Sequence, residues 1–440
     1  MRRCRSARLI SQAHHDTGGP LLRFIGLDIH RDFCEIAISE GGSARSAGRV
    51  KTDPEQLELF AQSLAPSDRV VLESTGNALA IARILQPHVE EVVLANPMHV
   101  RAISHAKVKN DRFDARILAE LLAADLIPRV WISDEQTRLL RRLTSRRTQL
   151  IRQRTRTKNE ISAVLVRNLK GRPPVTDLFG KKGRAWLAGL ELPADESQTV
   201  QGCLRQLDFL SDEIELIDRA LAEQALASQE IRRLMTIPGV GVTTTATVMA
   251  TIGDVRRFAT ADRLVGYLGL DPRSRQSGTA PARHGRISKQ GSSAARHVLV
   301  EAAWAAIKTP GPLRAFYQRV RARRGAQIAI VAVARKLAIL CWQLLTKQQD
   351  YAYQRPTHVA RKLRTLELRT GATRQKGKPL NSHPGSATDR ATQERVLTEQ
   401  AEHAYRRLVA DWKASAPSKK STGAAPPHAP QAQPAPNPVR

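Results

Sequence analysis

Carboxylate side chains interrupt apolar segments that otherwise have the pattern of buried strands. Asp28 breaks the run FIGLDIH and Glu73 ends the run RVVLE. Asp111 and Asp114 begin a helical segment three residues apart, so they share one face of it. Acids gathered in an apolar environment repel one another unless their charge is compensated. Two Mg²⁺ ions ~4 Å apart would compensate it and bind a phosphate group, so the four acids predict metal-dependent chemistry on nucleic acid.

Around these acids the chain alternates apolar runs with helical patterns. Strand patterns cover 21–29, 33–39, 69–72 and 91–94, and helical patterns cover 54–64 and 111–122. Two adjacent strands followed by strand–helix alternation predict an α/β domain with a central mixed sheet over 22–135, preceded by a flexible leader over 1–21. Each acid alone has a simpler interpretation, because Asp114, for example, could form a surface ion pair with Arg116 or Lys107.

A single long helix is predicted from 136 to 170, and it is unusually basic. Between Arg138 and Lys158 it carries nine cations and no acid. Such a series is often a solvated helix face, but uncompensated like charges repel, so a nucleic-acid backbone is the better partner. The predicted contacts include Arg141, Arg142, Arg146, Arg147, Arg152 and Arg154.

A second helix, over 204–223, has apolar residues spaced three and four apart, the pattern of a coiled-coil seam. It could pair with the first helix or with another subunit. Together the two helices define a helical coiled-coil segment over 136–229.

The following segment, 230–349, is predicted to be mainly helical. Its sequence IPGVG, residues 237–241, separates two helical patterns and resembles the turn of a helix–hairpin–helix. Such a turn exposes backbone N–H groups to a phosphate, which makes Gly239 and Gly241 candidate nucleic-acid contacts. The simpler alternative is a Pro-Gly turn between packed helices.

A basic loop follows, with six cations and no acid between Asp271 and Glu301. The predicted anion contacts are Arg273, Arg275, Arg283, Arg286 and Lys289. Ser277 precedes a glycine within this loop, and the positive field there would favour its alkoxide. On chemistry alone Ser277 is one candidate nucleophile among several, the others being Ser274, Ser288, Ser292 and Ser293.

Composition limits the function classes. The net charge of +29 favours a polyanionic partner. The four scattered cysteines indicate neither a disulfide framework nor a zinc site, as in a reducing cytoplasm. The apolar stretch 328–345 contains Arg335 and Lys336, so a buried helix is predicted rather than a membrane span. Residues 350–440 are basic and rich in Pro, Ala and Ser toward the end, and we expect them to be largely disordered.

Taken in order, these motifs resemble the insertion-sequence 110 family of transposases. The matching pieces are Gly26–His30, Leu72–Gly76, Lys109–Ala115, Ile237–Gly241, Gly266–Pro272 and Gln276–Gly291. They span about 22–349. Asn110 departs from the Thr that the family often has at this position.

The resemblance implies an RNase-H-like (RuvC-like) first domain whose DEDD acids Asp28, Glu73, Asp111 and Asp114 bind Mg²⁺, as two ions. It implies that Ser277 attacks DNA to form a phosphoserine intermediate. It also implies donor and target DNA, an element-encoded bridge RNA, and a homodimer that assembles into a tetramer. We expect a prokaryotic cytoplasmic protein that associates with the nucleoid when active.

Two other functions fit the same residues. A RuvC-like nuclease or junction resolvase would use water as the nucleophile and leave the serine incidental. A non-catalytic nucleic-acid-binding remnant of an element would use neither the acids nor the serine.

Overall fold

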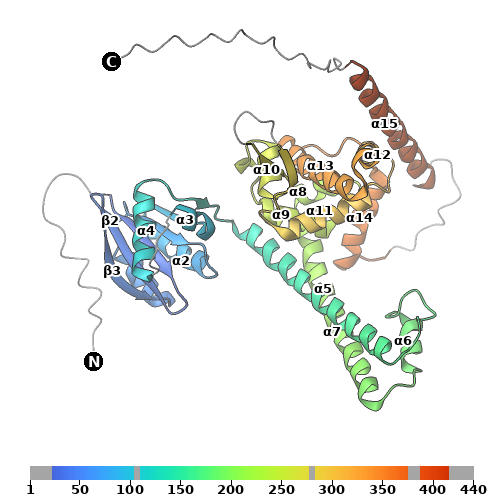
Figure 1. The fold of residues 1–440 in the computed structure, drawn as a ribbon, viewed down its shortest axis with the longest axis horizontal. Helices are drawn as coiled ribbons and strands as arrows, with labels where there is room; N and C mark the ends of the chain where they lie inside the picture. The colour runs from blue at the N-terminus through green and yellow to red at the C-terminus, as the bar shows by residue number, and fades with distance from the viewer. Residues whose placement is uncertain (1–21, 104–109, 277–282, 375–386, 416–440) are drawn as a thin grey trace, which may run out of the picture. The chain divides into compact units, whose positions relative to one another are not determined.

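The computed structural model describes residues 22–103, 110–276, 283–374 and 387–415. The chain divides into two compact units, with the boundary between Asp134 and Glu135 (Figure 1). The first unit is α/β, and the second is almost wholly helical. The three segments expected after residue 135 therefore fold within one unit.

A six-stranded mixed sheet forms the first unit, as the apolar pattern predicted. Its order is β3-β2-β1-β4-β5-β6, with β1, β2 and β3 antiparallel and β1, β4 and β5 parallel. The strands are β1 (Phe24–Ile29), β2 (Phe33–Glu40), β3 (Ser43–Lys51), β4 (Arg69–Glu73), β5 (Glu91–Ala95) and β6 (Arg129–Val130). The prediction missed β3 because most of its side chains are exposed, which leaves no apolar alternation to detect.

Helices cover both faces of the sheet. They are α1 (Pro54–Gln62), α2 (Ala78–Leu85), the short 3-10 helix η1 (Gln86–His88), α3 (Pro97–Ile103) and α4 (Asp111–Ala123). Leu57 of α1 and Ile81 of α2 share a core with Leu27 of β1. Leu118 of α4 belongs to a separate core with Val71 of β4, on the opposite face.

Gly26 brings α4 unusually close to β1. A Cβ atom on Gly26 would lie 2.1 Å from the carbonyl oxygen of Ala115 and 2.7 Å from the amide nitrogen of Ala119. Ala37, the partner of Gly26 on β2, packs against the same two alanines. Small residues therefore hold the first turn of α4 next to the end of β1.

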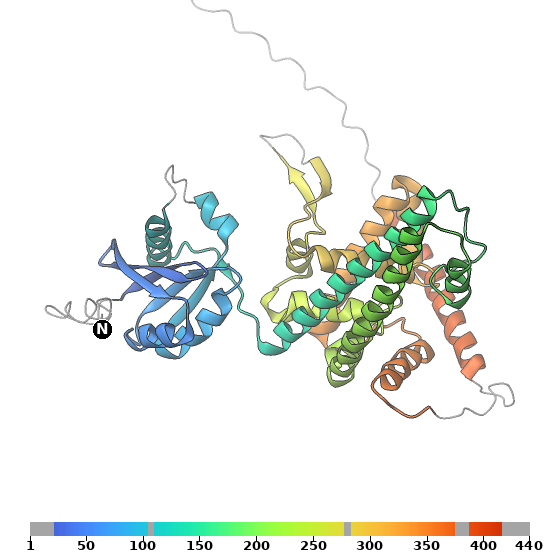
Figure 2. The ribbon, with the colours of Figure 1, turned by 90° about the horizontal axis from the view of Figure 1, so that it is seen from below.

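In the second unit, α5 (Glu135–Arg167) and α7 (Ala194–Ala227) lie side by side (Figures 1 and 2). Leu150 of α5 packs against Leu210 and Ile214 of α7. The seam predicted for the second helix thus pairs with α5 of the same chain, which decides between the two partners that the sequence allowed. The helix α6 (Lys181–Ala188) lies in the connection between them. Coiled-coil packing geometry in the strict sense stays a prediction.

After α7, the second unit continues with α8 (Gln229–Leu234), α9 (Val242–Ile252), η2 (Val255–Arg257), α10 (Ala261–Tyr267), β7 (Pro272–Arg275), β8 (Arg283–Ile287), α11 (Ser293–Ala306), α12 (Pro312–Arg324) and α13 (Ala326–Lys347). Of these, α8, η2, α10, α11 and α12 pack against α13. By length and composition α13 could cross a membrane, but half of its most apolar window is buried within the protein. Its buried side chains, Leu337 among them, belong to the main core of this unit.

The expectation of a largely disordered segment over 350–440 is wrong for two helices, α14 (Pro356–Arg369) and α15 (Ala387–Ser415). Leu366 of α14 is buried in the core that α7 contributes to. Glu402 of α15 is 2 % exposed and accepts hydrogen bonds from the Gly311 amide at 3.0 Å and from Arg314 Nε at 2.8 Å. Average composition missed these contacts because their partners lie far away in the sequence.

Candidate metal centre and nucleic-acid interface

The four predicted acids come from three elements that meet at one end of the sheet. In the parallel pair β1–β4, Leu27 lies beside Leu72, so Asp28 and Glu73 follow at the same level. Asp111 and Asp114 occupy the first turn of α4. Asn110 caps that turn, since its Oδ1 accepts a hydrogen bond from the Arg112 amide at 3.1 Å. Asn and Thr both cap helix N-termini, so Asn110 can form the same cap as the Thr that the family often has at this position.

Asp28 is the buried centre of this group. Its residue surface is 7 % exposed, and burial raises the pKa of its carboxyl to about 6. The pKa is lowered by His30 and raised further by Asp114, Glu73 and Asp111, which are therefore near enough to repel its charge. Of the four predicted acids, Asp28 and Asp111 have ligand atoms within 4.8 Å of each other, and Glu73 and Asp114 lie near enough to act on the charge of Asp28; their roles as ligands stay predictions.

His30 also belongs to this site, and the sequence analysis missed it. Its Nε2 lies 3.2 Å from Asp28 Oδ2 and 3.4 Å from Asp111 Oδ2, but it is aligned for a hydrogen bond to neither. One ligand atom from each of these three residues lies within 4.8 Å of the other two. The i, i+2 spacing of Asp28 and His30, which puts both on one side of an extended chain, was a usable signal.

The other buried acids of this unit have arginine partners, whereas no described arginine pairs with Asp28. Asp68 pairs with Arg23 at 2.5 Å. Glu35, opposite Asp28 across the β1–β2 pair and 1 % exposed, pairs with Arg49 and with Arg112. Within the described part of the chain, the only cationic group paired with Asp28 is His30. Oxygen donors without a permanent counter-charge, beside an unpartnered imidazole nitrogen, fit a divalent metal ion.

The prediction that the cations of α5 are uncompensated is wrong for the first half of that helix. Partners come from α5 itself and from α7: Glu135 pairs with Arg138 and Arg142, Glu213 with Arg146, and Asp218 with Arg147. Arg141 donates to the backbone carbonyl of Ala250 at 2.7 Å. The acids of α7 lie too far away in the sequence for a local count of charges to include them. Arg152 and Arg154 form no ion pair with any described residue, so they stay candidates for phosphate contact.

The turn over 237–241 lies between α8 and α9, and Gly239 takes a positive φ of 78°. Lys362 of α14 donates to the carbonyl oxygens of Met235, Ile237 and Val240 at 2.6, 3.2 and 2.8 Å. These three hydrogen bonds attach the turn to α14, a helix that the sequence analysis did not predict. Its identity as a helix–hairpin–helix, and the roles of Gly239 and Gly241, stay predictions.

The basic loop carries β7 and β8, which stand out from the helices (Figure 2). Its candidate anion contacts are exposed: Arg273, Arg275, Arg283, Arg286 and Lys289. Ser277 lies in 277–282, outside the residues that the structure describes. Two of the competing serines have structural roles, since Ser288 donates to Asp271 at 2.6 Å and Ser292 caps α11.

A mixed sheet with acids at one end, followed by a basic helical unit, is typical of nucleic-acid-processing proteins, and the acids form a candidate divalent-metal site. Two family models agree with this class. A model described as a transposase, the DEDD domain of IS110 elements, matches residues 25–168, and the "Transposase IS116/IS110/IS902 family" model matches residues 231–318. The chain belongs to the IS110/IS116 family of insertion-sequence transposases, which are DNA-processing enzymes.

Curated relatives cover most of the chain. A transposase for insertion sequence element IS1111A from Coxiella burnetii is 29 % identical over 75 % of this chain and 91 % of its own length. A transposase for element IS1328 from Yersinia enterocolitica is 25 % identical over 74 % of this chain and 98 % of its own. A pilin gene-inverting protein from Moraxella bovis is 26 % identical over 64 % of this chain and 81 % of its own.

Proposed function

We propose that this transposase cuts and rejoins DNA by metal-assisted transesterification. Two Mg²⁺ ions would be held by Asp28, Glu73, Asp111 and Asp114, with His30 beside them. The observation that carries the proposal is the electrostatic effect of these acids on a buried Asp28 that no arginine among the described residues compensates. When bound, the ions stabilise the charge that develops on the phosphate oxygens.

Ser277 is the proposed nucleophile. Its oxygen forms a bond to a backbone phosphorus while the bond from that phosphorus to a deoxyribose oxygen breaks, and the hydroxyl proton ends on the departing oxygen. One phosphate ester replaces another, so rejoining needs no ATP. The exposed arginines on both sides of Ser277, and the structural roles of Ser288 and Ser292, support this assignment.

We further propose that an element-encoded bridge RNA selects donor and target DNA, and that the chain acts as a homodimer that assembles into a tetramer on the bacterial nucleoid. Arg152 and Arg154, which pair with no acid in the described segments, offer their charge to RNA. Phe209 and Leu216 of α7 are 62 % and 60 % exposed and lie seven residues apart, which gives that helix an apolar face for a second subunit.

The test uses the full chain with Mg²⁺, the RNA encoded beside its gene, and DNA containing the element's junctions. Wild-type protein is expected to form a covalent protein–DNA adduct that survives a denaturing gel. Ser277→Ala should abolish the adduct and strand exchange but keep RNA binding. Ser274→Ala, which removes an exposed hydroxyl of β7, should behave as wild type. Normal strand exchange by Ser277→Ala would exclude the assignment.

A metal-dependent nuclease that uses water is the second candidate, because the complete acid cluster lies within the first unit alone. It predicts cleaved DNA with free 5′-phosphates and no adduct in the wild-type protein. The non-catalytic alternative predicts that Asp28→Ala leaves every product unchanged, whereas both enzymatic functions require loss of cleavage.

A further inference from the structure

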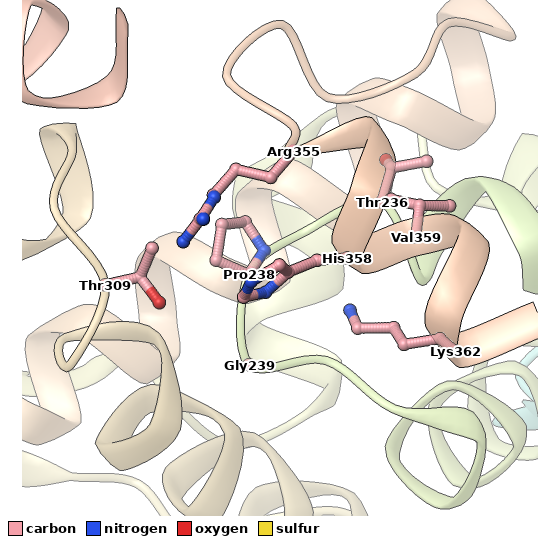
Figure 3. A pocket seen from close by; sticks show the side chains of 8 residues that line it. All are labelled: Thr236, Pro238, Gly239, Thr309, Arg355, His358, Val359 and Lys362. Carbon is pink, nitrogen blue, oxygen red and sulfur yellow. The ribbon is translucent and has the colours of Figure 1, made fainter. Parts of the chain in front are cut away.

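A small cavity lies between the 235–241 turn and α14, and its charged lining is entirely basic (Figure 3). The turn contributes Thr236, Pro238 and Gly239, the loop after α11 contributes Thr309, and α14 with its cap contributes Arg355, His358, Val359 and Lys362. The volume is about 40 Å³. One water needs about 10–15 Å³ by the same measure, so the cavity holds about three waters, the size of a single phosphate group but not of a base.

Lys362 acts as a positioning residue for this cavity. Its ammonium has three N–H donors, and all three are used by carbonyl oxygens of the turn. These bonds attach the turn to α14 and leave a positive charge beneath the cavity. Burial lowers the pKa of Lys362 to about 8, so the group is still mostly protonated at neutral pH.

Arg355 and His358 each keep a side-chain nitrogen that forms no hydrogen bond with another described residue. Arg355 Nη2 donates to the carbonyl oxygen of Ala391 at 3.1 Å, while its buried Nε has no hydrogen-bond partner among the described residues. His358 lies one helical turn further, on the same face of α14. Figure 3 shows the Arg355 guanidinium between Pro238 and Thr309, and the His358 ring beside the turn.

The nearest acid of α15 is already engaged. Glu394 accepts hydrogen bonds from the Thr357 amide at 3.0 Å and from the Thr357 hydroxyl at 2.6 Å, at the start of α14. It does not line the cavity. The pKa of His358 is lowered first by burial and then by Arg355, Arg361 and Lys362, and Glu394 raises it by less, so the three cations outweigh the one acid at this ring.

We propose that this cavity binds one phosphate group of the DNA backbone, with Arg355 and His358 as the contacting side chains. The cavity is too small for a nucleoside, so only a backbone phosphate can enter it and the contact is independent of sequence. The inference rests on the DNA substrate of the proposed function and not on its serine chemistry. It gives α14, which lies outside both segments matched by the family models, a role in holding DNA.

The test measures binding of the full chain to a fluorescein-labelled DNA duplex of mixed sequence, by anisotropy at several KCl concentrations in EDTA, where no cleavage interferes. Arg355→Ala should bind about tenfold more weakly, the effect of losing one hydrogen bond to a charged group. The slope of log K against log salt should become shallower by about 0.9, the value for one phosphate contact. Arg361→Ala is the matched control, because it removes the same charge from an exposed position of α14 outside the cavity.

Equal losses for Arg355→Ala and Arg361→Ala, or an unchanged salt slope, would overturn the proposal in favour of diffuse charge. If Arg355→Ala instead weakened binding to an RNA of the same sequence and left DNA binding intact, the choice of DNA would be overturned. Because Arg355 also contacts α15, His358→Ala serves as the second variant, and it should weaken DNA binding several-fold without changing the melting temperature. Ser277→Ala should bind DNA as the wild type does in this assay, so the assay tests the cavity even if Ser277 is not the nucleophile.

Discussion

Replacing Gly26 by alanine should separate α4 from β1 and damage the metal centre without touching any of its ligands. The added Cβ would lie 2.1 Å from the Ala115 carbonyl oxygen, and ordinary van der Waals contact begins at 3.4 Å, so α4 must move by about 1.3 Å (3.4 − 2.1). Overpacking of this kind costs about 1–3 kcal/mol. Displacement of about 1 Å at a catalytic group can cost ~100-fold in rate, so Asp111 and Asp114 would no longer meet Asp28 productively.

The stability cost is measurable as faster hydrogen exchange in peptides from β1 and α4, and the functional cost as weaker Mn²⁺ binding by calorimetry and slower DNA cleavage. The control is Gly76→Ala, because a Cβ at Gly76 meets nothing within 4 Å. It should leave the exchange of β1 and α4 unchanged. If Gly26→Ala keeps wild-type exchange, metal affinity and cleavage, the close approach of α4 does not position the site.

Further perturbations test the electrostatics. The pKa of Asp28 is about 6 against an ordinary 3.8, so the metal-free folded state holds a proton that the unfolded state releases, and it loses stability as pH rises from about 4 to 6. Asp28→Asn removes this charge and should stabilise the first unit above pH 6 by up to about 3 kcal/mol. Urea unfolding in EDTA measures the difference. Metal affinity of the wild type should fall about tenfold per pH unit below about 6, measured by Mn²⁺ titration. His30→Ala should lower Mn²⁺ affinity about tenfold while the far-ultraviolet circular dichroism stays unchanged; equal affinities would remove His30 from the site. Arg147→Ala should destabilise the α5–α7 pair by roughly 1–3 kcal/mol, because it removes the 2.5 Å partner of Asp218 and leaves that buried carboxylate only Arg369 at 3.7 Å. Arg152→Ala should leave the melting temperature unchanged and weaken nucleic-acid binding.

The sequence by itself determined four of the six strands in the first unit and singled out the four acids. Apolar runs near Asp28 and Glu73 locate two neighbouring strands, and the spacing of Asp111 and Asp114 places both on one helix face. These features are local, because periodicity within one element determines which side chains share a face. They also carried the resemblance to the transposase family, which the family models confirm.

The tertiary structure decided which charges are compensated. Local counting treated the basic face of α5 as free, but Asp218 and Glu213 of α7 neutralise part of it across the helix pair. Composition assigned disorder to the segment that carries Glu402, whose partner Arg314 lies 88 residues away. In both cases the deciding contact joins distant segments, and a Coulomb interaction depends on separation in space and not along the chain.

The same reason explains His30 and Lys362. His30 becomes a candidate ligand only when β1 and α4 come together, and Gly26 permits that approach. Lys362 acquires its role only because α14 folds back on the 235–241 turn. The acids in the sequence predicted metal chemistry, and the packing of distant elements determined which side chains surround those acids and which cations have partners.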